Sequence, residues 1–205
     1  MPTNITLNED EQDCLQELMN ISYGAATAAI AQIIDRFATL NIPKIKTVSS
    51  TELEEYFLKR FNNKSKYYIS NQLISGHLCG ENMFIMDDTS IYNLSKEFGL
   101  EDDEIDEDEL KDVMLEISNI ISTTTISKLT ALIDSSVIFS PPSIKIVEFL
   151  DNLEDRYKTE YQHIIIIATD LKFKDQNIYG ELIILSKDES ILYLKKALNK
   201  LLDEY

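Results

Sequence analysis

Two long segments of the chain carry the apolar spacing of an amphipathic helix, and strand-like segments follow each of them. Apolar residues recur every three or four positions over residues 8–37 and again over residues 107–136, and this spacing predicts one long helix in each place. The strand-like segments are residues 67–78, 83–86, 163–173 and 182–185. They contain β-branched and aromatic residues in short runs, which favours strands over helices.

Each half therefore has the same predicted order of elements: helix, strand, short helical or loop segment, strand, strand, helix. Gly80 and Gly180 stand shortly before two of the strands and mark turns that suit antiparallel hairpins. This order predicts an α/β (α+β) sandwich, in which an antiparallel β-sheet packs against long helices.

The two halves also match each other in sequence. The segment from Gly80-Glu81 to Ser90-Ile91 aligns with the segment from Gly180-Glu181 to Ser190-Ile191, at an offset of 100 residues. Such a match indicates internal duplication, with a period too long for a solenoid. We expect a single domain, residues 1–205, built from two pseudo-two-fold repeats at about residues 8–100 and 107–205.

A run of acidic residues joins the two predicted repeats. Residues 101–109 are all Asp or Glu apart from Ile105. Such a run repels itself and usually forms a solvated linker or the first turn of a helix, where the helix dipole favours negative charge. We interpret it as the linker that leads into the second long helix.

One polar pattern occurs on both predicted long helices at identical spacing. Its members are Asp13, Glu17, Asn20 and Pro43 in the first half and Asp112, Glu116, Asn119 and Pro142 in the second. Steps of four and three residues return to the same side of a helix, so the Asp, Glu and Asn of each set form one stripe. Duplication alone explains a repeated core pattern, whereas a repeated solvent-facing carboxylate and carboxamide indicates chemistry or docking. We therefore treat both stripes as candidate sites.

Apolar residues occupy the opposite side of both helices. They are Leu15, Leu18, Met19, Ala26, Ala29, Ile33 and Phe37 in the first helix and Leu110, Met114, Ile117, Ile121 and Leu132 in the second. When this side packs on a sheet, the stripes must face solvent or a partner. Pro43 and Pro142 are expected to be structural, because a fixed φ and a missing N–H suit the start of a strand.

The charge of the chain limits its partners. The formal net charge is −17, whereas nucleic-acid backbones and anionic membranes are bound by clusters of Lys and Arg. We expect no binding to nucleic acid or membrane, and no apolar run is long enough to span a bilayer. The N-terminal segment lacks the pattern of a secretory signal, and Cys14 and Cys79 do not suggest a disulfide framework. These features favour a cytoplasmic protein.

The other chemistry-bearing residues have simpler explanations. His77 and His163 lie in predicted strands without a second ligand pair at metal spacing, so structural roles are favoured over a metal site. Tyr56, Phe57 and Phe61 form an aromatic cluster that is more typical of a packed surface segment than of a docking patch.

The repeated polar pattern resembles the signature of the CheC/CheX/FliY family of bacterial chemotaxis phosphatases. That signature is Asp or Ser, three residues, Glu, two residues, Asn, 22 residues and Pro, and both halves match it at every defined position. The resemblance covers nearly the whole chain. The duplicated layout without additional domains looks most like stand-alone CheC.

This resemblance implies hydrolysis of the aspartyl phosphate of a phosphorylated CheY-type response regulator. Glu17 and Glu116 would pair with the active-site Lys of the regulator, and Asn20 and Asn119 would hold the attacking water. Asp13 and Asp112 match the first signature position and would have a supporting role. The resemblance implies no cofactor of the protein's own, because the partner supplies the Mg²⁺.

Two departures from the family pattern predict unequal sites. The first helix has Ser22 and Tyr23 before Gly24, where the family commonly has glycine directly after Asn-Ile, and residues 120–126 contain no glycine. We therefore expect the two sites to differ in activity.

Two other functions compete with catalysis. One is a non-catalytic adaptor that binds a response regulator or CheD, the chemoreceptor-modifying deamidase; the other is a purely structural duplicated domain. Retention of both Glu and Asn favours the enzyme, since a scaffold does not require them. Duplication also internalises a symmetry that a single-site homologue would obtain by dimerising, which predicts a monomer.

Overall fold

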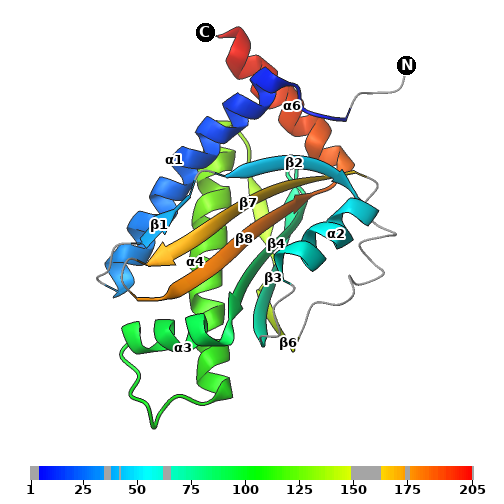
Figure 1. Cartoon of the computed structure of the whole chain (residues 1–205). Helices are drawn as coiled ribbons and strands as arrows, with labels where there is room; N and C mark the ends of the chain where they lie inside the picture. The colour runs from blue at the N-terminus through cyan, green and yellow to red at the C-terminus, as the bar shows by residue number, and fades with distance from the viewer. Residues whose placement is uncertain are drawn as a thin grey trace.

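A single antiparallel sheet runs through the protein, and the long helices lie on one of its faces (Figure 1). The computed structural model describes residues 5–34, 38–41, 43–61, 66–148, 163–173 and 176–204. Within these residues, every pair of neighbouring strands is antiparallel. The predicted α+β class, an antiparallel sheet packed with long helices, is confirmed.

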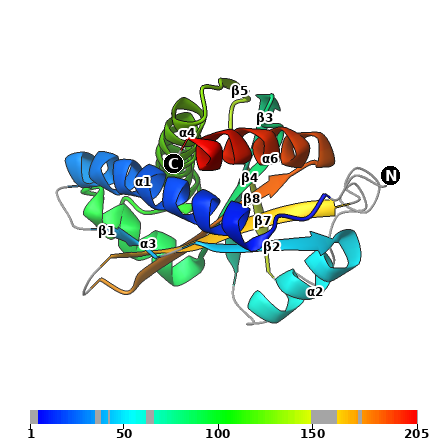
Figure 2. The ribbon, with the colours of Figure 1, turned by 90° about the horizontal axis from the view of Figure 1, so that it is seen from above.

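The helices fall on both sides of this sheet. The long helices are α1 (Glu9–Ile34) and α4 (Glu107–Leu132), and they share one face with α6 (Asp188–Asp203), whereas α2 (Ser50–Arg60) lies on the other face (Figure 2). The short helix α3 (Asp88–Glu97) contributes to the same core as the long helices. None of the described helices is both long enough and apolar enough to cross a bilayer.

The sheet interleaves strands from the two halves. Its strands are β1 (Ala38–Leu40), β2 (Lys44–Ser49), β3 (Tyr67–Gly76), β4 (Gly80–Asp87), β5 (Val137–Phe139), β6 (Ser143–Val147), β7 (His163–Phe173) and β8 (Ile178–Ser186). Their order is β1-β7-β8-β4-β3-β5, with β2 also paired to β7 and β6 also paired to β3. Each half therefore lends its first two strands to the hairpin of the other half.

The centre of the sheet is buried on both faces. Along β8, Leu182 and Ile184 belong to the core beneath the long helices, whereas Ile183 and Leu185 belong to the core beneath α2. Double-sided burial explains why this segment and residues 164–168 read as continuous apolar runs. The aromatic residues Phe57 and Phe61 are buried in the second core, so the predicted packed segment is confirmed.

Two glycines permit close packing where the central strands β4 and β8 pair. A Cβ on Gly180 would lie 2.6 Å from Cζ of Phe84, and a Cβ on Gly80 would lie 2.0 Å from the carbonyl oxygen of Leu185. Their register is nearly symmetrical, because Gly80 pairs with Ser186 and Gly180 pairs with Met86. The matched Gly-Glu pairs thus mark the two ends of the central strand pair.

The first long helix differs in one place from the expected pattern. The apolar spacing predicts that Ile33 lies in the core, but its side chain is 47 % exposed, because the buried line of α1 runs through Ala26, Ile30 and Ile34. A residue next to Ile34 lies about 100° around the helix from it. Leu132 is only half-buried, and Phe37 lies outside the described residues.

Candidate functional site

The two polar stripes occupy exposed sides of the long helices. On α1 the side chains are Asp13, Glu17 and Asn20, and on α4 they are Asp112, Glu116 and Asn119; all six residues are exposed. The opposite sides of both helices pack into the core, with Leu15, Met19, Met114 and Ile117 almost fully buried. The helical spacing thus leaves both stripes open to a partner.

The start of α1 is fixed by a buried carboxylate. Glu11 and Asn8 form a reciprocal cap, in which each backbone N–H donates to the side chain of the other at 2.8 Å. The Glu11 carboxylate also accepts hydrogen bonds from Lys195 and Asn199 of α6, each at 2.8 Å. Burial raises the pKa of Glu11, but these hydrogen bonds outweigh it and hold the pKa below its usual value. Two residues before Asp13, the helix is therefore anchored to α6.

A groove with apolar walls runs beside the first stripe. It has a volume of about 760 Å³, and Asp13 and Glu17 line it together with Cys14, Leu18, Ile21, Leu132, Leu201 and Leu202. Ile21 is 49 % exposed and Leu202 is 37 % exposed. This surface presents acidic and apolar groups side by side, a combination that suits contact with a protein.

Each motif proline begins a strand close to the stripe of its own repeat. Pro43 directly precedes β2 and Pro142 directly precedes β6. In the first repeat, Nε2 of Gln16 on α1 donates to the carbonyl oxygen of Pro43 at 3.4 Å. The constant spacing between Asn and Pro thus brings a turn of the sheet alongside the helix.

The second stripe is connected to the sheet through a residue that the sequence analysis did not single out. Nε2 of Gln72 on β3 donates to Oδ1 of Asn119 at 3.1 Å and to the carbonyl oxygen of Ser140 at 3.0 Å. Ser118 adds a second link, since its hydroxyl forms a hydrogen bond with that of Ser70 at 2.7 Å. Only an alignment of the two hairpins, strand against strand, would have drawn attention to Gln72.

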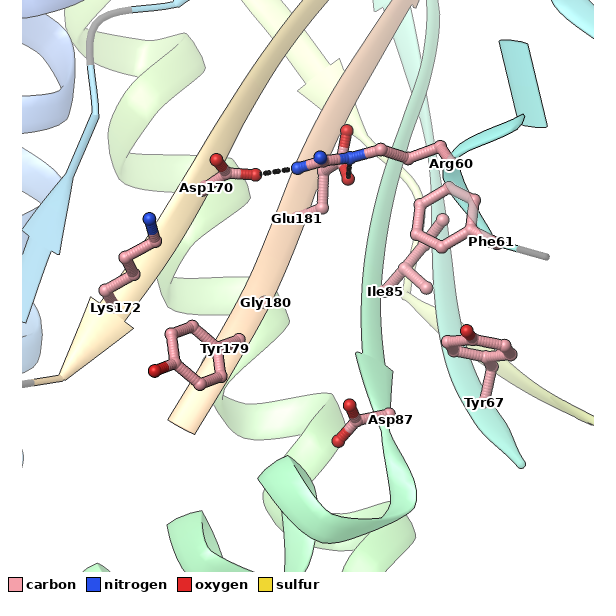
Figure 3. Close-up of a pocket in the computed structure, with 10 residues that line it drawn as sticks. All are labelled: Arg60, Phe61, Tyr67, Ile85, Asp87, Asp170, Lys172, Tyr179, Gly180 and Glu181. Carbon is pink, nitrogen blue, oxygen red and sulfur yellow. Dashed lines mark hydrogen bonds and ion pairs between the residues drawn. The ribbon is translucent and has the colours of Figure 1, made fainter. Parts of the chain in front are cut away.

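A pocket with polar and apolar walls lies on the face of the sheet that α2 covers (Figure 3). Arg60, at the end of α2, reaches across β8 to form ion pairs with Glu181 and Asp170, and the Tyr56 hydroxyl donates to Glu181 at 2.7 Å. Burial raises the pKa of Glu181, although the hydrogen bonds from Arg60 and Tyr56 act in the opposite direction. These contacts attach α2 to the sheet, so the pocket has a structural explanation.

The histidines and cysteines are not gathered into a metal site in the described part of the chain. No group of three His, Cys, Asp or Glu side chains with suitable geometry occurs there. The ring of His77 stacks on that of Tyr193, with 4.6 Å between the ring centroids. Cys14 and Cys79 are free.

Solved structures with the same fold include a FliY, a CheX and a chain of a FliG–FliM complex. Thermotoga maritima FliY matches with a TM-score of 0.74 at 15 % identity, covering 95 % of this chain and 98 % of that chain. CheX from Desulfovibrio desulfuricans gives 0.53 at 13 % identity over 83 % and 99 %. A chain of the FliG–FliM complex from H. pylori gives 0.60 at 6 % identity over 91 % and 100 %. No protein-family model and no curated protein matches the sequence.

Proposed function

We propose that this chain, which has the fold of the CheC/CheX/FliY family, acts in chemotaxis signalling by hydrolysing the aspartyl phosphate of a CheY-type response regulator. The match to stand-alone CheC in particular stays a prediction. The observation that carries the proposal is the repeated exposed stripe, Glu-x-x-Asn, on both long helices. Protein partners are also in keeping with a fold that occurs in the FliG–FliM complex.

The chemistry of an acyl phosphate suits such a stripe. The phosphoryl group is already activated, so catalysis consists mainly of placing a water in line with the leaving oxygen. The carboxamides of Asn20 and Asn119 offer a donor and an acceptor without a charge that would repel the phosphoryl oxygens. Glu17 and Glu116, one turn away, would fix the register by charge-assisted contact with a lysine of the regulator. The regulator would bring the Mg²⁺ that neutralises the phosphoryl group.

The test is phosphate release from a phosphorylated, Mg²⁺-loaded CheY-type regulator. We expect the protein to accelerate release, and we expect the double variant Asn20→Ala/Asn119→Ala to lose about 10²- to 10³-fold in rate, by analogy with other residues that position a reacting group. The single variants apportion the rate between the two sites. Retained helical circular dichroism would show that the loss is not unfolding.

Gln32→Ala is the matched control. Gln32 is an exposed carboxamide on the same helix as Asn20 but twelve residues further on, which places it about 120° around the helix. Its removal should leave the rate unchanged. An accelerated rate that is indifferent to both motif asparagines would refute the proposed chemistry.

A non-catalytic adaptor is the second candidate, and the contact between Gln72 and Asn119 favours it at the second stripe. A carboxamide that already serves the fold is less available for chemistry. Titration of the phosphorylated regulator separates the two functions: binding without faster phosphate release would identify an adaptor, whereas acceleration identifies the enzyme.

A further inference from the structure

The two motif asparagines are held differently. The carboxamide of Asn119 accepts a hydrogen bond from Gln72, which is itself buried at 3 % exposure. Among the described residues, the side chain of Asn20 has no hydrogen-bond partner. The second carboxamide is therefore tethered to the sheet, whereas the first is free to rotate.

The residue that corresponds to Gln72 in the other hairpin is Thr169. In each hairpin, the residue that directly follows Gln72 or Thr169 pairs across the strands with the Glu of the aligned Gly-Glu sequence. These register pairs are Leu73 with Glu81 and Asp170 with Glu181. Gln72 and Thr169 thus occupy the same place on β3 and β7.

Both residues bind the turn that precedes the motif proline. The backbone N–H of Ser140 donates to the carbonyl oxygen of Leu73, and the backbone N–H of Asn41 donates to the carbonyl oxygen of Asp170. The Thr169 hydroxyl donates to the carbonyl oxygen of Asn41 at 2.6 Å, just as Gln72 donates to that of Ser140. The turns are equivalent, so the difference lies in the strand side chain.

The number of donors explains the difference. A hydroxyl has one proton to donate, whereas a carboxamide nitrogen has two. Thr169 uses its single proton on the turn. Gln72 uses one on the turn and the other on Asn119. Only the second repeat therefore has a strand side chain that donates to the turn and to the motif asparagine at once.

This contact sets which edge of the asparagine faces a docked partner. With Oδ1 directed at Gln72, the exposed edge of Asn119 presents Nδ2, which only donates. An attacking water needs an acceptor for one of its protons, which directs a lone pair at phosphorus; a donor cannot accept that proton and engages a lone pair of the water instead. We propose that Gln72 is a positioning residue that turns the Asn119 carboxamide inward and makes the second site the slower one. The inference rests on the proposed function.

The test replaces Gln72 by the residue of the other repeat. Gln72→Thr is introduced into Asn20→Ala, so that the second site alone acts on the phosphorylated, Mg²⁺-loaded CheY-type regulator. We expect phosphate release to rise by about fivefold over Asn20→Ala, the factor that corresponds to the net strength of one hydrogen bond. The gain should appear in kcat with KM unchanged, because the docking carboxylate Glu116 is untouched.

Two controls make the outcome decisive. Adding Asn119→Ala to the same background should return release to the spontaneous decay of the regulator, and Gln72→Thr should retain the Tm of its parent within a few degrees. An unchanged or lower rate of phosphate release in Asn20→Ala/Gln72→Thr would overturn the proposal. The hydrogen bond from Gln72 to Asn119 would then have no effect on the rate or would increase it.

Side-chain amide NMR separates this inference from the function on which it rests. In the wild type, the Gln72 NH₂ protons should exchange slowly, and the Asn119 amide signals should shift in Gln72→Thr while those of Asn20 stay in place. Fast exchange and unshifted signals would refute the tether itself. A tether confirmed by NMR in a protein that does not accelerate phosphate release would instead refute the proposed function and the rate difference with it.

Discussion

Asn20 and Asn119 are the same residue at the same helical position, yet one neighbouring side chain separates their surroundings. Gln72 reaches Asn119, and its counterpart Thr169 uses its only donor on the turn. Glu11 shows the same effect of local context, because it is buried and bonded to α6. At this scale, residue identity fixes the chemistry available, and the neighbours decide which part of it remains free.

Glu11 gives a prediction for the dependence of stability on pH. Its pKa is lower in the folded protein than its usual value of 4.5, so it contributes stability above that pH and loses the contribution as pH falls through the folded pKa. Glu11→Gln should lower the free energy of unfolding at pH 7 by about 1–3 kcal/mol. Urea unfolding at pH 7 and below pH 4 should show the difference narrowing in acid. Glu9 is an exposed neighbour on the same turn, so Glu9→Gln should leave the free energy of unfolding unchanged at both pH values. An effect as large as that of Glu11→Gln would show that the contacts of Glu11 with α6 do not stabilise the fold.

At the scale of elements, the position of each helix follows from what its apolar side can bury. Strands β4 and β8 pack closely at Gly80 and Gly180. Helix α1 presents its polar stripe to solvent and also exposes one apolar side chain, Ile21. Helix α2 is positioned by the buried rings of Phe57 and Phe61 and by the ion pairs of Arg60. These contacts lead to two predictions.

Gly180→Ala should destabilise the protein by about 1–3 kcal/mol, the usual cost of overpacking a core. The added Cβ would lie 2.6 Å from the Phe84 ring, which is almost fully buried and has little room to move. Gly24→Ala on α1 is the matched control, because nothing apart from its chain neighbours and the adjoining helix backbone lies within 4 Å of its Cβ position. It should stabilise the helix by about 0.5–1 kcal/mol. Thermal unfolding measures the Tm of both variants. Equal shifts in Tm would show that the close approach of Gly180 to Phe84 has no effect on stability.

Ile21→Asp should weaken docking at the first stripe. Ile21 lines the groove that Asp13 and Glu17 share, so an added carboxylate would remove apolar contact and increase the local negative charge. We expect KM for the phosphorylated regulator to rise severalfold in the Asn119→Ala background, with kcat nearly unchanged. Leu58→Asp is the control, since Leu58 is 41 % exposed on α2 across the sheet. If both changes have the same effect, the groove has no role in docking.

At the scale of the whole molecule, the halves depend on each other. β1 and β2 pair with β7, and β5 and β6 pair with β3, so every hairpin requires two strands from the other half. Asp106 caps α4 with hydrogen bonds to two backbone N–H groups of its first turn, so the end of the acidic run belongs to the second helix. The central pairing of β4 with β8 joins the two hairpins.

Cutting the chain after residue 103 tests this dependence. Residues 1–103 alone and residues 104–205 alone should lack native circular dichroism or aggregate, because each leaves long strand edges unpaired. Mixed or co-expressed, the fragments should form a one-to-one complex by size-exclusion chromatography with the circular dichroism of the intact protein. A first fragment that folds as a monomer would show that the repeats are independent units.

Much of the fold followed from short-range patterns. The spacing of apolar residues identified α1 and α4 to within a few residues, and β7 coincided with the predicted segment 163–173. The three-residue strands β1 and β5 escaped prediction, because pieces of that length carry no measurable alternation. The stripes were identified by repetition, but the partner of Asn119 was not, since Gln72 lies 47 residues away in sequence.

The sequence by itself determined the two amphipathic helices, the internal repeat and the polar residues on each exposed side, because these depend on spacing along the chain. The tertiary structure alone decided how the strands interleave, which carboxylates are buried, and which carboxamide is tethered. Those features depend on residues that meet only when distant strands pair. The difference between the two candidate sites belongs to this second class, since it arises where β3 and β7 carry different side chains beneath equivalent turns.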